Sequence, residues 1–311
     1  MSAAGHMQPS GPSAMNGQGS RLPASLALAM MLAVAVGAPL AANVPRELRV
    51  CADPDSLPFS NDRLEGFENR IASLIAEELH ATVRYTWSMQ RRGFLRRTLQ
   101  SGACDVVMGV PAGLPGVLAT RPYYASTYVF VAARERNLEL GNFDAPALRG
   151  LRIGLQAIGA EGANTPPASA LARRGLMKNV VGFAMWGPNG ASEERARIID
   201  AVAAGTIDTA VVWGPLAGYY ARRYSQRLVL TPVTSDPLKP ELPFVYEIAL
   251  AVRSGDDALR AQLEAVLDRR QQDIRAILDE YGVPPAGAST RALDGVVLGQ
   301  AVVSRDPRKE H

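Results

Sequence analysis

The residues LRVCADPDSLPFSNDRLEGFENRIASLIAEEL, from Leu48 to Leu79, decide the fold of this chain. They predict a strand over Leu48–Ala52, a polar loop that runs to Gly66, and a helix from Phe67 onward, where apolar residues recur at a helical period. Proline at position 54 ends the strand, because it has no N–H for a ladder and restricts the residue before it. A strand that leads into a helix is the first half of a βαβ unit. Ligands of open α/β sheets bind at the carboxyl ends of such strands, which places residues 53–66 at a binding edge.

Composition narrows the class of protein. The chain has 311 residues, 47% of them hydrophobic and 20% charged, as expected for a globular protein with two domains. Its formal net charge of +3, with no basic run interleaved with aromatic residues, argues against a nucleic-acid partner. The only histidines are His6, His80 and His311, which disfavours a histidine-based catalytic site or a His-rich metal site. We expect no metal site, no catalytic residue and no cofactor.

The N-terminus has the pattern of a Sec-type signal peptide. An apolar run over Leu22–Ala38 follows Arg21 and leads into small residues, with Ala42 as the preferred last residue of the signal. A membrane anchor is the alternative, but the run is shorter than about 20 residues and is bounded by Pro23 and Pro39. We expect residues 1–42 to be removed on export to the periplasm, and the rest of the chain to contain no membrane span.

Strands and helices alternate along the remaining chain in two units. The first continues with strands over Ala81–Trp87 and Cys104–Val110 and leaves its lobe along Tyr128–Ala132. The second contains a helix for which Ser192 is the expected N-cap. A strand over Phe244–Arg253 and one long amphipathic helix over Asp256–Tyr281 have no unit of their own, so we expect them to return to the first.

This returning path predicts two α/β lobes joined by a double hinge around a cleft. The expected parts are a signal peptide (1–42), lobe 1 (43–132 plus 244–285), lobe 2 (133–236), a hinge segment (237–243) and a C-terminal tail (286–311).

Cys51 and Cys104 are the only cysteines, and each belongs to an apolar, strand-like run. If the two strands are neighbours in a parallel sheet, the side chains lie level and a disulfide can form in an oxidising compartment. Two buried thiols are the alternative. We favour the disulfide.

Several polar and aromatic side chains are expected at the cleft because they end strands or flank the hinge. For each aromatic residue the alternative is packing under the loops, and for the arginines it is a solvated pair. Glu65 and Glu68, near the start of the first helix, are expected to complement its dipole, with an acid–base pair as the sharper alternative. The expected cleft residues are Asp53, Phe59, Trp87, Arg91, Arg92, Tyr123, Tyr124, Gln156 and Trp213, together with Pro111 and Trp186.

A set of short motifs resembles one group of solute-binding proteins. The type II periplasmic binding proteins share the order of strands, crossing connections and terminal helix expected above. Within them, the chain resembles the quinoprotein-dehydrogenase-associated solute-binding-like proteins, the J proteins of methanol oxidation systems. The resemblance covers most of residues 46–285 and rests on CADP (51–54), QRRG (90–93), CDVVMGVP (104–111), GANTPP (162–167) and VVWGP (211–215).

The resemblance implies a non-catalytic accessory protein in the periplasm. Its implied partner is a methanol dehydrogenase carrying pyrroloquinoline quinone (PQQ), with the c-type cytochrome of that system as a further partner, and a small-molecule ligand is left open. A solute receptor of an ABC transporter is the alternative, and a dehydratase of prephenate-like acids on the same scaffold is the weakest reading. Amino-acid-binding relatives carry a Thr and an Arg that clamp the ligand carboxylate. Here that region is compressed to residues 119–122, which argues against the clamp.

Overall fold

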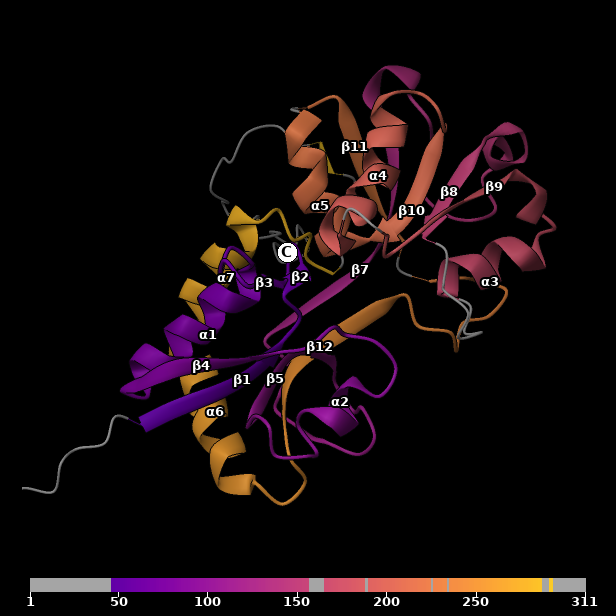
Figure 1. Cartoon of the computed structure of the whole chain (residues 1–311). Coiled ribbons are helices and arrows are strands. Elements are labelled where there is room, and N and C mark those ends of the chain that lie inside the picture. Colours follow the sequence, from indigo (N-terminus) through magenta and orange to yellow (C-terminus); the bar gives the residue numbers. More distant parts are fainter. Residues whose placement is uncertain are drawn as a thin grey trace, which may run out of the picture. The chain divides into compact units, whose positions relative to one another are not determined.

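The computed structural model describes residues 46–156, 165–187, 190–224, 226–233, 235–286 and 291–292 (Figure 1). The expected signal peptide, the first half of the GANTPP motif and most of the expected tail lie outside these residues. No helix within them is long and apolar enough to cross a membrane.

Lobe 1 is built on a parallel sheet with β1 (Arg46–Ala52) between two neighbours. Strand β4 (Ala81–Trp87) pairs with β1 along its whole length, and β5 (Val106–Pro111) pairs with the other edge. Strand β12 (Val245–Val252) then runs antiparallel to β5, so the late strand returns to the first lobe as expected. The short strands of this lobe are β2 (Asp55–Ser56), β3 (Ser60–Asn61) and β6 (Leu118–Ala119).

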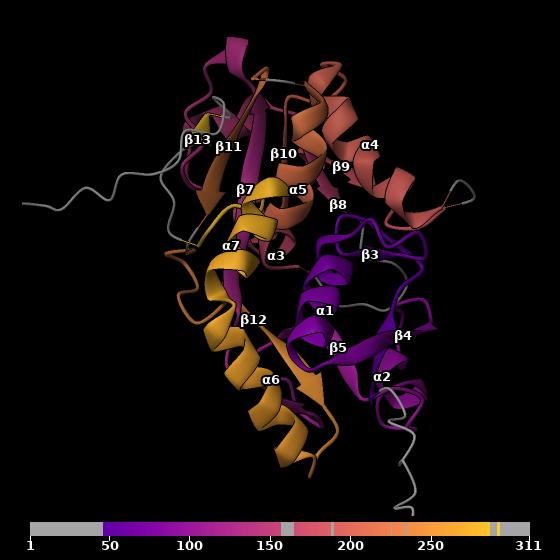
Figure 2. The ribbon, with the colours of Figure 1, turned by 90° about the vertical axis from the view of Figure 1, so that its left-hand side faces the viewer.

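Alternate residues of these strands face two separate cores, as the two-residue period of a strand requires. Val50 packs with α1 (Phe67–Glu78), α6 (Asp257–Arg269) and α7 (Gln271–Glu280), whereas its neighbour Cys51 packs with α2 (Phe94–Arg97). Figures 1 and 2 show the three long helices together, with α2 across the sheet from them.

The terminal helix differs from its prediction. The expected single helix over Asp256–Tyr281 is two helices, because Arg270 has φ −104° and ψ 18° and interrupts the helical backbone. The Arg270 side chain reaches Glu78 of α1 and Asp273 of α7. This break lets α7 change direction while both helices bury apolar residues against the same sheet.

Lobe 2 has its own sheet in the order β11, β7, β10, β8, β9. Strand β8 is parallel to β10 and β9, and β7 is antiparallel to β10 and β11. Helices α4 and α5 pack on one face and α3 on the other (Figure 1). The elements are β7 (Tyr124–Ala133), β8 (Ile153–Gln156), α3 (Pro166–Arg173), β9 (Val180–Phe183), α4 (Ala191–Ala203), β10 (Thr209–Trp213), α5 (Gly214–Ala221), β11 (Leu228–Val233) and β13 (Arg291–Ala292). The 3-10 helices are η1 (Arg134–Arg136), η2 (Pro146–Gly150), η3 (Met177–Asn179) and η4 (Arg222–Tyr224).

Strand β7 joins the lobes. Its first residues, Tyr124–Thr127, pair with β12 in lobe 1, and its later residues from Tyr128 pair with β10 and β11 in lobe 2. The sequence predicted a strand over Tyr128–Ala132 only, which is the lobe 2 part. A second connection runs from the end of β11 to the start of β12. The chain therefore has the type II periplasmic binding protein fold, with two lobes that β7 and the segment between β11 and β12 connect, and β13, which follows α7 in the sequence, pairs with β11 of lobe 2.

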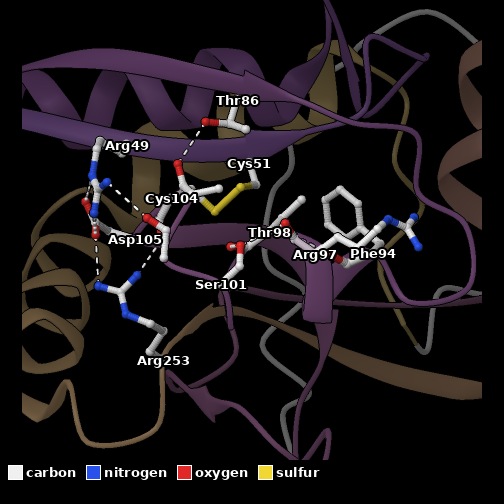
Figure 3. Close-up of a disulfide and its surroundings, with 12 residues drawn as sticks. Arg49, Cys51, Thr86, Phe94, Arg97, Thr98, Ser101, Cys104, Asp105 and Arg253 are labelled. Carbon is white, nitrogen blue, oxygen red and sulfur yellow. Dashed lines mark hydrogen bonds and ion pairs between the residues drawn. A yellow bond between two sulfur atoms is a disulfide. The ribbon is translucent and has the colours of Figure 1, made fainter.

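The predicted disulfide is present (Figure 3). Cys51 at the end of β1 is bonded to Cys104, which lies two residues before β5, with their Cα atoms 5.5 Å apart. Below it, Asp105 accepts hydrogen bonds from Arg49 and Arg253 and so connects β1 to the end of β12.

Candidate binding cleft

A cavity of about 580 Å³ lies where the carboxyl ends of the sheets meet, and residues of both lobes line it. Its volume is in the usual range for a small-molecule site. Most of its surface is apolar or aromatic, with a few polar groups. The aromatic residues are Phe59, Tyr124, Tyr128, Trp186, Trp213 and Tyr246. The polar side chains are Ser56, Glu68, Gln90, Gln156, Thr165 and Arg195.

Strands β7, β10 and β12 provide one aromatic wall of the cavity. Tyr128 of β7 packs edge-on against Trp213 at the end of β10, with ring centroids 5.4 Å apart, and against Tyr246 of β12 at 6.5 Å. Trp213 and Tyr246 are also edge-on to one another, at 5.7 Å. Each ring fixes the other two, so this wall is preorganised at the hinge.

Glu68 places a carboxyl group in the lobe 1 wall. It lies in the first turn of α1 and is 5% exposed. Among the described residues its carboxyl has no hydrogen-bond or ion-pair partner, and burial raises its pKa to about 8. Gly109 of β5 makes room for it: a Cβ there would be 2.1 Å from Glu68 Oε1, and its φ of +70° also favours glycine. Glu68 is therefore mostly protonated at pH 7.

The lobe 2 wall contains hydrogen-bond donors without acceptors. Arg195 of α4 is 5% exposed, and its Nη1 donates to Ser56 Oγ at 2.6 Å. Its Nε has no partner among the described residues, and the same holds for Gln156 Nε2 and Trp186 Nε1. All three nitrogen atoms are buried, so each keeps an unmet hydrogen bond within the described part of the chain, which is costly and rare in folded proteins.

The loop after β1 contacts α4 across the mouth of the cavity. The Asp55 carboxylate accepts hydrogen bonds from the backbone N–H groups of Ala191 and Ser192, at 2.5 and 3.2 Å. The Leu57 N–H donates to Ser192 Oγ at 2.9 Å. We call these three hydrogen bonds the lobe contact. Ser192 was expected to be the N-cap of α4, but the N-cap is Gly190, which has no side chain, and Asp55 of the other lobe provides the acceptor instead.

Four of the predicted cleft residues line the cavity, namely Phe59, Tyr124, Gln156 and Trp213, as do Pro111 and Trp186. Asp53 is not one of the residues that line the cavity. It is buried and accepts hydrogen bonds from the backbone N–H groups of Gln90 and Asp55, which hold the start of the loop after β1 in place. Tyr123 packs against Tyr124, and its buried hydroxyl has no partner within the described part of the chain.

Three further predicted residues lie outside the cavity wall. Trp87 stacks on Tyr85 of the same strand, with centroids 4.5 Å apart. The guanidinium carbon of Arg91 lies 5.8 Å from the ring centroid of Trp186, so Arg91 contacts a residue of the cavity wall. Arg92 is exposed, and its carbonyl accepts from Arg97.

Sequence reasoning missed the most distinctive polar residue of the site, Arg195, and two of its aromatic residues, Tyr128 and Tyr246. Tyr128 lies on β7, which crosses between the lobes, and Tyr246 lies on β12, directly after the second connection, and these positions were an available signal. Arg195 carried none, since it lies inside an amphipathic helix. Glu68 was assigned mainly to the helix dipole, and only its burial reveals the unpaired carboxyl.

The carboxylate clamp of amino-acid-binding proteins is not reproduced by Arg121. Its Nη2 donates to Asp268 of α6 at 2.7 Å, its backbone N–H donates to Glu264, and its side chain is 60% exposed. It does not line the cavity. No group of acidic, histidine or cysteine side chains within the described ranges could hold a metal ion.

The family model for bacterial extracellular solute-binding proteins of family 3 matches residues 48–284. The chain therefore belongs to that family.

The chain is 32% identical to the protein MoxJ of Methylorubrum extorquens over 248 residues, which are 76% of this chain and 81% of that protein. It is 30% identical to MoxJ of Paracoccus denitrificans, over 81% of this chain and 93% of that protein. The crystal structure of the periplasmic binding protein XoxJ from Methylobacterium extorquens AM1 superposes with a TM-score of 0.63 at 33% identity, and the match covers 78% of this chain and all of XoxJ. Within the family, its similarity is thus to the J proteins.

Proposed function

We propose that this chain is a periplasmic, non-catalytic accessory protein of a PQQ-dependent methanol dehydrogenase, and that it acts by binding that enzyme or promoting its activation. The observation that carries the proposal is the similarity to two MoxJ proteins over more than three quarters of the chain. The similarity to XoxJ at 33% identity supports the same placement, including the periplasm.

The missing clamp supports this assignment over amino-acid transport. Arg121 stands in the segment where the amino-acid-binding relatives carry the clamp, and it forms ion pairs with α6 on the surface of lobe 1. Of the side chains that line the cavity, Arg195 is the one permanent cation, and it belongs to lobe 2. A receptor that held an α-carboxylate from lobe 1 would need a cation that this wall does not supply.

A solute receptor of an ABC transporter is a second candidate, and the cavity of about 580 Å³, which is lined mainly by aromatic and apolar side chains, favours it. Both functions are compatible with a bound small molecule. They differ in the protein partner, which is a dehydrogenase in one case and a permease in the other.

Partner capture separates the two. An affinity-tagged copy is expressed from its own locus, cross-linked in intact cells, purified from the cell envelope and periplasm, and its partners are identified by mass spectrometry. We expect the dehydrogenase subunits to be enriched over a strain with a tagged, unrelated periplasmic binding protein. Enrichment of a permease without dehydrogenase would overturn the proposal and favour the transporter receptor.

A further inference from the structure

We propose that exposed arginines at α2 of lobe 1 form a docking surface for an acidic face of the partner protein. Three of them, Arg92, Arg96 and Arg97, are called the arginine cluster here. The inference rests on the proposed function, because it assigns the surface through which this chain binds the methanol dehydrogenase. It concerns the surface over α2 and not the cavity between the lobes.

The segment that contains the cluster has no acidic residue. From Leu79 to Cys104 the sequence has five arginines and no aspartate or glutamate. One of the five, Arg84, forms an ion pair with Glu47 of β1, so four positive charges of the segment are left unbalanced. The motif QRRG (90–93), for which the proposed function gives no role, lies in this segment.

The cluster differs from other arginines of lobe 1 in its lack of carboxylate partners. All three of its side chains are exposed, and none forms an ion pair with a residue that the structure describes. Arg49, in contrast, is paired with Asp105. Arg91 adds a fourth exposed charge directly before the cluster, and its guanidinium contacts the ring of Trp186 and not a carboxylate. This surface therefore keeps a positive charge that an outside anion could balance.

The guanidinium groups of the cluster converge over Gly93. A Cβ at Gly93 would lie 2.9 Å from Arg97 Nη1 and 3.5 Å from Arg96 Nη2, so both groups lie over the same backbone position. Arg97 Nη1 also donates to the Arg92 carbonyl at 2.8 Å, which fixes its direction. Like charges at such separations repel one another, and a carboxylate placed against both groups would relieve that repulsion.

Buried residues hold the cluster on a rigid base. Phe94 and Leu99 pack with Cys51 and Cys104 in one core, and the disulfide joins the two cysteines. Figure 3 shows Phe94 beside this disulfide and the side chain of Arg97 directed away from it. A preorganised surface loses less conformational freedom when it binds, so this base favours recognition.

The composition of the surface fits a protein partner. Arginine and methionine are enriched at protein–protein interfaces, and Met89, in the loop before the cluster, is 50% exposed. A guanidinium binds a carboxylate through two parallel hydrogen bonds, so the complementary face is expected to carry Asp and Glu. Opposite charges on the two faces would also speed up association.

The test is biolayer interferometry with this protein and the methanol dehydrogenase, both purified from the periplasm of the same cells, at 50 and 500 mM NaCl. We expect the wild type to bind, and to associate about tenfold more slowly at the higher salt concentration, because salt screens the attraction. Arg96→Glu/Arg97→Glu should lower the association rate constant about tenfold or more at 50 mM NaCl. The matched control, Lys178→Glu/Arg275→Glu, reverses two exposed charges elsewhere on the chain and should associate close to the wild-type rate.

Hydrogen exchange locates the contact, and we expect added protection over residues 89–102 in the complex. Circular dichroism and melting curves show whether each variant is folded. Unchanged association of folded Arg96→Glu/Arg97→Glu, an equal loss in the control, or protection confined to other segments would overturn the inference and leave the dehydrogenase proposal intact. A wild type that does not bind at either salt concentration would instead overturn the inference together with the proposed binding of the enzyme.

An anionic membrane is the competing partner, and vesicles of phosphatidylglycerol and phosphatidylethanolamine test it in a sedimentation assay. We expect the wild type and Arg96→Glu/Arg97→Glu to sediment equally with these vesicles. If the variant loses vesicle binding but associates with the dehydrogenase as the wild type does, the arginine cluster is a membrane contact and the inference is wrong.

Discussion

The carboxylate of Asp55 accepts hydrogen bonds from the N–H groups of Ala191 and Ser192, which are the first two residues of α4 in the other lobe. A helix N-terminus attracts anions through its unpaired N–H groups and its dipole. In this protein the chain supplies its own anion, so a residue of lobe 1 caps a helix of lobe 2. Asp55 is therefore one of the side chains that connect the lobes, together with Arg195, which donates to Ser56, and Tyr220, whose hydroxyl donates to the Leu57 carbonyl.

Removal of this carboxylate should loosen the lobes. We expect Asp55→Ala to lower the free energy of unfolding by about 1–2 kcal/mol, the usual effect of losing a cap, and to raise the radius of gyration by opening the cleft. Small-angle scattering and denaturant unfolding measure the two effects. Asp62→Ala is the matched control, since Asp62 is an exposed acid of the same loop and makes no lobe contact. Identical scattering from wild type and Asp55→Ala would contradict the account.

Acid should act on the same contact. Burial by itself would raise the pKa of Asp55, but hydrogen bonds from Ser192 and from the Ala191 N–H hold it below the ordinary value. A carboxyl whose folded pKa is depressed stabilises the fold above its unfolded pKa, near 4. That contribution is lost as the pH falls through the folded value. We therefore expect the wild-type radius of gyration to stay constant as the pH falls to about 4 and to rise towards that of Asp55→Ala only in more acidic solution, whereas a rise that begins above about pH 5 would argue against it.

A second acid-sensitive centre lies in lobe 2. Asp236 is fully buried and accepts hydrogen bonds from Arg173 and Arg174 of the segment that ends α3. Burial alone would raise its pKa, yet these guanidinium groups bring it to about 2. Asp236→Ala leaves two cations without their buried partner and should cost about 3–5 kcal/mol. Asp144→Ala removes an exposed partner of the same Arg174 and should cost about 0–1 kcal/mol. Urea unfolding compares them, and equal losses would refute the distinction.

The disulfide should stabilise lobe 1. Cys51 and Cys104 are 53 residues apart in sequence, and the chain-entropy relation gives about 4 kcal/mol for a loop of that length. We expect the double variant Cys51→Ala/Cys104→Ala to unfold at lower denaturant concentration, and reduction of the wild type to shift its midpoint in the same direction. The double variant should show no response to reductant. A wild-type midpoint unaffected by reductant would contradict this.

Arg121 should behave as a surface residue. Arg121 forms ion pairs with Asp268 and Glu264, and its own side chain is exposed to solvent. Arg121→Ala should therefore change the free energy of unfolding by no more than about 1 kcal/mol. Urea unfolding measures the change, and a loss of more than about 2 kcal/mol would contradict the surface placement of this side chain.

The fold was predictable to a large extent because its signals are local. The strand and helix of residues 48–79 are present as predicted, whereas the expected loop between them contains the short hairpin of β2 and β3, and the late strand pairs with β5 in the first lobe. The errors lie where tertiary contacts override local pattern. Asp55 replaces Ser192 as the capping group of α4, and Arg270 interrupts a helix whose apolar period continues across it. The boundaries expected for the lobes stay a prediction.

The site was predictable only in part. Strand ends indicated Gln156 and Trp213, because the topology alone brings such residues to one edge. Nothing local marks Arg195 as a cavity residue, since its position depends on how α4 meets the loop of lobe 1. The raised pKa of Glu68 depends on burial under Gly109 and on the lack of a nearby cation, which are properties of the folded protein.

The central claim is that the dehydrogenase needs this protein. The most direct measurement is methanol dehydrogenase activity per amount of enzyme protein, together with its bound PQQ, in a strain with a clean deletion of this chain. The account predicts a marked loss of specific activity or cofactor content, restored by the wild-type chain expressed in trans. Full specific activity and full PQQ content in the deletion strain would contradict it.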